Sequence, residues 1–386
     1  MSMPHAETLT LLERLVACPT VSAESNLELI ALAEAHLAAA GFATRRLPSA
    51  DGRKAGLAAH LGGTRGGILL SAHSDVVPVA GQDWTRPPFA LTRAEGRLYG
   101  RGTTDMKGFL AAALSLAGRA GRSTPKLPLM LLISYDEEVG CTGIRDMGPG
   151  IRALGWQPDL CIVGEPTGMA PAIGHKGKAA FTALCRSTPG HSSVAPRHVN
   201  SLHLATDLIA ALRRMQDDYA TGPHQDAGYD IAFSTVHVGT LSGGTALNIV
   251  PDRAQLSFEF RHLPADAPAD FLTRLQAEVQ DILDRCRDRD PAAGIELAVT
   301  NTYPGLQIAA DHPAVAEVAG LAGNAPPIKV SYGTEAGYLS QYGFPTVVCG
   351  PGDMNGQGHK ADEYLTLQQL AACDRMMDRI LARLNA

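Results

Sequence analysis

The sequence of 386 residues has neither the long apolar runs nor the surplus of basic residues that would place it in a membrane or on nucleic acid. No run of 18 apolar residues occurs, so no segment is predicted to span a bilayer. The formal net charge of −6 provides no electrostatic footprint for nucleic acid. The N-terminal segment carries Glu7 and Glu13 among its leucines. It is predicted to be an amphipathic helix and not a signal peptide.

Cysteine is scarce and scattered as well. The chain has seven cysteines, an odd number, and no CxxC pair. This pattern disfavours a disulfide framework and a thiolate zinc site, and it indicates free thiols in a reducing compartment, which we expect to be the cytoplasm. The GxSxG motif of serine hydrolases is also missing, and no cysteine lies in a recognisable nucleophile context. Serine and cysteine hydrolase chemistry is therefore disfavoured.

What the first part of the chain does contain is an alternation of two kinds of segment. Apolar runs bounded by proline or glycine, typical of buried strands, lie at 66–75, 127–138 and 158–166. Helix-like segments lie at 26–40 and 105–118. Such alternation predicts an α/β fold with a mostly parallel sheet.

The pattern changes over residues 175–300, where the predicted order is β-α-β-β-α-β, a ferredoxin-like α+β arrangement. The α/β pattern then returns, with a strand at 344–352 and a helix at 366–384. We therefore expect an α/β/α domain of residues 1–174 and 301–386, interrupted by an inserted domain.

Histidine and carboxylate residues gather where the predicted strands of the α/β domain end. In an open α/β sheet, ligands bind beyond the carboxyl ends of the strands, so these side chains are expected to share one polar site. They are His73 and Asp75 after the first strand, Glu137 and Glu138 after the second, Glu165 at the third, His359 beyond a glycine-rich loop after the last, and Asp105 in a glycine-rich turn before a helix.

These residue types are typical of a metal site. Histidine and carboxylate ligands without thiolates suit zinc, cobalt or manganese. Five ligands exceed the three that one catalytic zinc needs, and they suit two metals about 3.5–4 Å apart that share a carboxylate. Taken alone, a histidine at a strand end is more often a satisfied structural residue, and an Asp-Glu-Glu run is more often a solvated turn. Their joint occurrence favours two metals, with Glu137 left as a general base.

Six segments, in this order, resemble the M20 family of metallo-aminoacylases and peptidases. They are SAHSDVVP, GRGTTDMKGF, DEEVGCTG, VGEPT, PGHSSVAP and GHKADEYL. The resemblance extends over nearly the whole chain. It implies a di-metal hydrolase whose catalytic domain is interrupted by a lid and dimerisation domain.

The resemblance also implies a role for each residue. His73 and Glu165 are expected to bind one metal, and Glu138 and His359 the other, with Asp105 bridging the two. Glu137 corresponds to the general base. Asp75 corresponds to a carboxylate that orients the His73 ring. The family also has a cis peptide bond after the bridging aspartate, here Asp105-Met106.

Three expected residues lie in the inserted domain. His191, in PGHSS, resembles a histidine that reaches the neighbouring subunit's site and stabilises an oxyanion; the alternative is an ordinary surface histidine. Asn248 and Arg261 resemble anchors for a substrate carboxylate, with Arg261 making the bidentate pair; the alternative for Arg261 is a solvated charge at a strand end.

Within the family, the GTEAG and HKADEY segments are similar to acetylornithine deacetylases. We therefore expect a cytoplasmic homodimer, formed through the lid domain, that acts on a small N-acyl amino acid with two divalent ions. Zinc is the expected metal and cobalt the alternative. Glu335, in GTEAG, is expected near the site, paired with the cationic amino group of an ornithine substrate. The alternatives are another aminoacylase, a succinyl-diaminopimelate desuccinylase, a dipeptidase and, remotely, a non-catalytic binding protein.

Overall fold

The computed structural model describes residues 3–386, which divide into two compact units. The α/β unit comprises the chain as far as Gly174 together with Leu306–Val330 and Thr334–Ala386, and the inserted unit comprises His175–Gly305 with Ser331–Gly333. The second boundary falls at 305/306 instead of the expected 300/301, because the last strand of the inserted unit continues to Tyr303.

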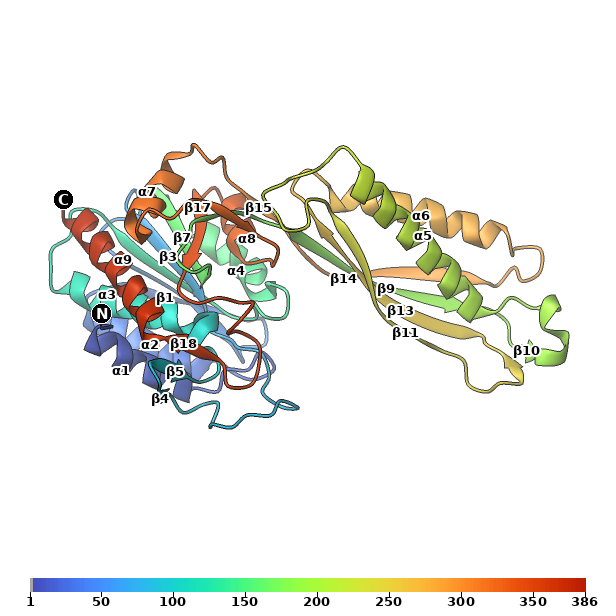
Figure 1. Cartoon of the computed structure of the whole chain (residues 1–386), viewed down its shortest axis with the longest axis horizontal. Coiled ribbons are helices and arrows are strands. Elements are labelled where there is room, and N and C mark those ends of the chain that lie inside the picture. Colours follow the sequence, from blue (N-terminus) through green and yellow to red (C-terminus); the bar gives the residue numbers. More distant parts are fainter. Residues whose placement is uncertain (1–2) are drawn as a thin grey trace. The chain divides into compact units, whose positions relative to one another are not determined.

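A nine-stranded sheet forms the centre of the α/β unit (Figure 1). Its order is β1-β2-β6-β3-β7-β17-β8-β15, and β16 pairs with β8. The four strands β6, β3, β7 and β17 run parallel, which confirms the predicted mostly parallel sheet. The strands are β1 (Ala43–Pro48), β2 (Ala55–Leu61), β3 (Ile68–His73), β6 (Leu129–Ser134), β7 (Leu160–Pro166), β8 (Ala172–His175), β15 (Leu306–Gln307), β16 (Ile328–Val330) and β17 (Thr346–Gly350).

Helices cover both faces of this sheet. Helices α1, α2, α3, α7 and α9 share one hydrophobic core with one face, and α3 is buried almost all round because its sequence is nearly all apolar. On the other face, Met147 of α4 packs against Gly56 of β2, and α8 contacts β17. The helices are α1 (Ala6–Ala17), α2 (Leu27–Ala39), α3 (Gly108–Gly121), α4 (Thr142–Arg152), α7 (Pro313–Ala322), α8 (Ala336–Gln341) and α9 (Leu367–Asn385).

The inserted unit is a four-stranded antiparallel sheet with two helices, which confirms the predicted β-α-β-β-α-β order. The strand order is β11-β13-β9-β14. Every second residue of β9 and β13 is buried, so one face of the sheet carries the core, where Phe260 stacks on Phe271 of α6. The elements are β9 (Gly177–Arg186), α5 (Ser201–Thr221), β11 (Thr235–Gly243), β13 (Arg253–His262), α6 (Pro268–Asp284) and β14 (Gly294–Tyr303).

Two smaller sheets and a short turn complete the fold. A three-stranded sheet in the α/β unit joins β4 (Thr92–Ala94), β5 (Arg97–Tyr99) and β18 (Tyr364–Thr366), and a two-stranded ribbon in the inserted unit joins β10 (Gly190–His191) and β12 (Ile249–Val250). A short 3-10 helix, Ser192–Arg197, follows β10. All seven cysteines are free thiols. Among residues 3–386, no helix is both long and apolar enough to cross a membrane.

Candidate metal centre

The parallel register of the central strands places the expected ligands at one edge of the sheet. His73, the last residue of β3, lies opposite Ser134, the last residue of β6. Ser71 of β3 lies opposite Val163 of β7, so Glu165 is level with His73 two residues further along. The strands therefore deliver His73, Glu165 and the Asp-Glu-Glu run after β6 to the same place.

Asp105 lies between two histidines. One carboxylate oxygen, Oδ1, is 2.9 Å from Nε2 of His73, and the other, Oδ2, is 3.0 Å from Nε2 of His359. Asp105 is buried in a short irregular helical turn, Thr103–Lys107, and the peptide bond Asp105-Met106 is cis, as the resemblance implied. A carboxylate with one oxygen toward each histidine has the arrangement that a bridge between two metals requires.

The two histidines have different further neighbours. His73 Nε2 is 3.7 Å from Oε1 of Glu165, whereas His359 Nε2 is 3.0 Å from Oε2 of Glu138. His73 thus has Glu165 as a neighbour and His359 has Glu138, but ligand atoms of His73, Asp105 and Glu138 also lie within 4.8 Å of one another. The expected assignment of these ligands to two metals stays a prediction.

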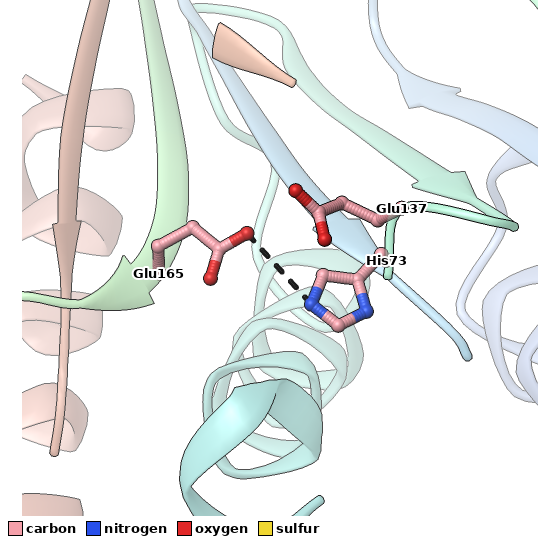
Figure 2. Close-up of side chains that lie close together, drawn as sticks. All are labelled: His73, Glu137 and Glu165. Carbon is pink, nitrogen blue, oxygen red and sulfur yellow. Dashed lines mark ion pairs between the residues drawn. The ribbon is translucent and has the colours of Figure 1, made fainter. Parts of the chain in front are cut away.

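Glu137 lies within this cluster, and its carboxylate is one of three groups, with His73 and Glu165, that could hold a metal ion. Figure 2 shows the carboxyl groups of Glu137 and Glu165 converging on the His73 ring from the turn after β6 and from β7. Ligand atoms of these three residues lie within 4.8 Å of one another. The thiol of Cys141 donates a hydrogen bond to Oε1 of Glu137 at 3.3 Å. Glu137 is thus close to the expected ligands, and its role as general base stays a prediction.

Asp75 supports the site differently from what was expected. Nδ1 of His73 is 2.9 Å from the main-chain carbonyl of Asp75, and the Asp75 carboxylate is 3.6 Å from that nitrogen. The carboxylate instead accepts hydrogen bonds from the main-chain N–H groups of Glu137 and Glu138, at 3.1 and 3.3 Å, and from the Ser22 hydroxyl at 2.7 Å. The main chain of Asp75 orients the histidine, and its side chain holds the turn that carries the acids.

The electrostatics of the cluster are those of an acid-rich pocket. Burial raises the pKa of Glu137 to about 8 and that of Glu138 to about 7, and burial with the nearby Asp105 raises the pKa of Glu165. Hydrogen bonds to Asp105 and Glu138 raise the pKa of His359 to about 10. Burial alone would raise the pKa of Asp105, but hydrogen bonds from His359 and His73 outweigh it and lower that pKa. Without other cations, the pocket therefore holds protons.

The residues present fit a pair of divalent cations. Oε1 of Glu165 is buried, and within residues 3–386 it has no hydrogen-bond partner, so it is an acceptor aimed into the site with a free lone pair. The donor set consists of imidazole nitrogens and carboxylate oxygens, which suits zinc and related metals. Cations would also replace the protons that the carboxylates otherwise keep.

This electrostatic arrangement predicts how pH affects the stability of the metal-free protein. Glu137, Glu138 and His359 have pKa values above their usual ones in the folded protein. A group of this kind stabilises the fold at low pH, and that contribution is lost as the pH rises through the folded pKa. The chelated protein should therefore lose stability between about pH 4.5 and pH 10. Asp105, with its lowered pKa, opposes this trend only in strong acid.

Added metal should reverse the loss. At a free concentration of a hundred times its Kd, a metal that binds only the folded protein stabilises it by about 2.7 kcal/mol. Because the ligands must lose their protons to bind, the gain in Tm should be larger at pH 8 than at pH 5.5. Thermal unfolding with chelator and with added Zn²⁺ or Co²⁺ measures both effects. A metal-induced gain that shrinks as the pH rises would contradict the assignment.

The position of Glu335 argues against the role expected for it. Its side chain is fully buried, and its two oxygens accept hydrogen bonds from the hydroxyls of Ser71 and Ser134, each at 2.5 Å. A carboxylate with no exposed surface and both oxygens occupied has no free face for a substrate amino group. Glu335 is the N-cap residue of α8 and lies against β3 and β6, and these contacts argue against the expected contact with substrate.

The three expected residues of the inserted unit lie in two places within that unit. His191 is exposed, and its Nδ1 is 2.8 Å from the Ser193 hydroxyl. Asn248 is exposed next to it, since its carbonyl accepts the N–H of Ser192. Arg261 is half-buried on β13 and donates to Glu259 at 3.0 Å and Tyr303 at 2.7 Å. Their roles stay predictions.

Sequence reasoning missed four residues that support the cluster. Ser22 and Cys141 bond to Asp75 and Glu137, as described above. Arg101 and Glu363 form a buried ion pair at 2.7 Å beside Asp105. Cys141, Arg101 and Glu363 lie inside the motifs DEEVGCTG, GRGTTDMKGF and GHKADEYL, so the signal was present, but a motif does not tell which of its members support the ligands.

Comparisons with known proteins agree with this geometry. Residues 69–383 match peptidase family M20/M25/M40. The chain is 35% identical to the acetylornithine deacetylase of Myxococcus xanthus over 382 residues, 96% of each protein. It is 32% identical to that of Pasteurella multocida over 383 residues, 97% of each.

Solved structures of similar fold extend over the same length. A tripeptidase from Staphylococcus aureus has a TM-score of 0.78 and 19% identity, and the match covers 99% of this chain and 100% of that one. A metallo-carboxypeptidase of the M20 family from Sulfolobus solfataricus gives the same values. The fold, the grouped ligands and the sequence match lead to one conclusion: the chain belongs to peptidase family M20/M25/M40 and is a hydrolase of that family.

Proposed function

We propose that this protein hydrolyses the acetamide of N2-acetyl-L-ornithine to L-ornithine and acetate, a step of arginine biosynthesis. The observation that carries the reaction type is Asp105, whose two oxygens face His73 and His359, with Glu137 beside them. The substrate is supported by relatives described as acetylornithine deacetylases that match more than nine-tenths of the chain.

In this proposal His73 and Glu165 would hold one divalent ion, His359 and Glu138 would hold the other, and Asp105 would contribute to both sites. The ions, zinc or alternatively cobalt, would polarise the amide carbonyl and make water acidic enough to attack it at neutral pH. Asp75 keeps the acids in place through the main-chain N–H groups of the turn after β6.

Glu137 performs the proton transfers. Its carboxylate takes a proton from the attacking water as the C–O bond forms, and then gives that proton to the nitrogen of the departing ornithine as the C–N bond breaks. His191 of the inserted unit is proposed to donate a hydrogen bond to the oxyanion in a neighbouring subunit, and Asn248 with Arg261 to bind the substrate carboxylate.

The remaining parts of the proposal follow from the same resemblance. The protein is proposed to act in the cytoplasm as a homodimer joined through the inserted unit. Because Glu335 is buried, no residue of the described structure is assigned to the ornithine side chain.

The proposal predicts a clear substrate order. N2-acetyl-L-ornithine should be hydrolysed with a kcat/KM at least about 100-fold above that for N-succinyl-diaminopimelate, for neutral N-acetyl amino acids and for dipeptides, since each of these alters groups that a polar site has to pair. Steady-state kinetics on this panel, with metal content determined on the same preparation, is the test. A higher kcat/KM for a succinylated substrate or a dipeptide would leave the protein a hydrolase but contradict N2-acetyl-L-ornithine as its substrate. No turnover in a preparation with two metals per chain would count against the reaction.

A further inference from the structure

A buried ion pair lies between the segments that carry two of the proposed ligands. Arg101 and Glu363 have side chains only 1% exposed, and Nη1 of Arg101 donates to Oε2 of Glu363 at 2.7 Å. Neither is a proposed ligand. Burying such a pair costs desolvation that an apolar pair of similar volume would avoid, so the pair is weak evidence for stability alone. Its contacts suggest another use.

The second oxygen of Glu363 holds the main chain at Asp105. Oε1 accepts the N–H groups of Thr104 at 2.9 Å and of Asp105 at 3.2 Å. Asp105 and the residue after it have non-helical main-chain angles inside a short helical turn, so a regular helix does not set their position. The carboxylate of Glu363 therefore supplies the acceptor that fixes the peptide carrying the bridging side chain.

Arg101 extends the same network to the loop of His359. Its Nη1 also donates to the carbonyl of Lys360 at 3.4 Å, and its Nη2 donates to the side-chain oxygen of Gln82. The Gln82 amide in turn donates to the carbonyl of His359 at 3.2 Å. His359 has a φ of 58°, a conformation that non-glycine residues seldom adopt, and it lies in a loop without ladder hydrogen bonds. The network contributes to holding this loop, together with the hydrogen bonds from Thr85 to Asp362 and from Gln357 to the carbonyl of Tyr364.

The other ligand pair is held in a different way. His73 and Glu165 are part of β3 and β7, where parallel strand pairing sets their main chain. We propose that Arg101 and Glu363 are positioning residues for the second cation site: they place Asp105 and His359, and so set the affinity of the Glu138–His359 side more than that of the His73–Glu165 side. This inference rests on the metal centre of the proposed function.

The test measures metal binding without substrate. Chelated protein is titrated with Co²⁺, binding is followed by the visible absorption of the bound ion, and metal per chain is determined after dialysis. The main variant is R101M/E363M, because apolar side chains remove every hydrogen bond of the pair without leaving a buried charge. The second is E363Q, which keeps an acceptor for the N–H groups of Thr104 and Asp105. The control is D374N, which alters another buried carboxylate that accepts a main-chain N–H, from His5, away from the ligand segments.

The wild-type protein and D374N should bind two ions per chain. In R101M/E363M the Glu138–His359 site should weaken by about 10- to 100-fold and the His73–Glu165 site by clearly less, since only Asp105 is shared, and E363Q should fall between this variant and the wild type. Two sites of wild-type affinity in R101M/E363M, or equal weakening of both, would overturn the inference. If the wild-type protein bound no Co²⁺, both the proposed metal centre and this inference would be contradicted. A protein that shows the expected Co²⁺ pattern but does not hydrolyse N2-acetyl-L-ornithine leaves the inference standing and rejects the substrate.

Discussion

Replacing Glu137 by glutamine is expected to lower kcat on N2-acetyl-L-ornithine by about 10²- to 10⁴-fold, while the metal content stays at the wild-type value. Glutamine has nearly the same shape as glutamate but does not take up the proton of the attacking water. In the proposal Glu137 is the base and His73, Asp105, Glu138, Glu165 and His359 are the ligands, so metal binding should survive the loss of the Glu137 carboxylate. Steady-state kinetics and elemental analysis of one preparation give both quantities.

The adjacent Asp136 provides the matched control. It belongs to the same run of acids, but its carboxylate accepts a hydrogen bond from Lys54 at 2.5 Å and is not part of the cluster. Asp136→Asn should therefore leave kcat within a few-fold of the wild type. If Glu137→Gln kept near-normal turnover, or if it lost its metals together with its activity, Glu137 would not be the general base.

The sheet edge that carries the site was predictable because the signals for it are local. Each apolar run that ends in a histidine or an acid became a parallel strand, as β3 ending at His73 and β6 ending before Asp136 illustrate. Parallel pairing then brings residues far apart in the chain to the same edge. The inserted unit was predictable for a similar reason: β9 and β13 alternate buried residues with half-buried or exposed ones, a pattern that does not depend on distant partners.

The role of Glu335 was not predictable in this way. The segment GTEAG indicates an acid near a turn, which fits a residue at the rim of a site as well as one in the core. Glu335 is a core residue because it bonds to the hydroxyl groups of Ser71 and Ser134, which are 264 and 201 residues away in the chain. Burial also raises the pKa of Glu335, because it penalises the charged form. Only the packing of α8 against the sheet tells the two possibilities apart.

The atoms that support the ligands were hidden from the sequence for a related reason. Asp75 was expected to orient His73 with its carboxylate, and the structure assigns that contact to its carbonyl. Main-chain groups are present at every residue, so a motif contains no sign of which of them bonds. The roles of Arg101 and Glu363 could not be predicted for the same reason, because these side chains bond to main-chain atoms of Thr104, Asp105 and Lys360.

Replacing Asp105 by asparagine is expected to have the largest effect on the metal centre. Both histidines lie within hydrogen-bonding distance of this one carboxylate, so its charge contributes to both proposed sites. Loss of a negative ligand shared by two cations should weaken both of them, whereas Glu165→Gln should weaken only the ion beside His73. Because metal ions contribute several kcal/mol of transition-state stabilisation, and 1.36 kcal/mol is a factor of ten in rate, activity should fall by about 10³-fold or more.

The number of metal ions bound per chain shows whether Asp105 binds both ions or only one. After dialysis against metal-free buffer, the wild-type protein should keep two ions, Glu165→Gln about one, and Asp105→Asn close to none. The D374N protein serves again as the control for altering a buried carboxylate. If Asp105→Asn kept one tightly bound ion, Asp105 would belong to a single site, and the hydrogen bond to the other histidine would be structural. Two retained ions would remove Asp105 from the centre altogether, and the division of the remaining ligands into two pairs would lose its basis.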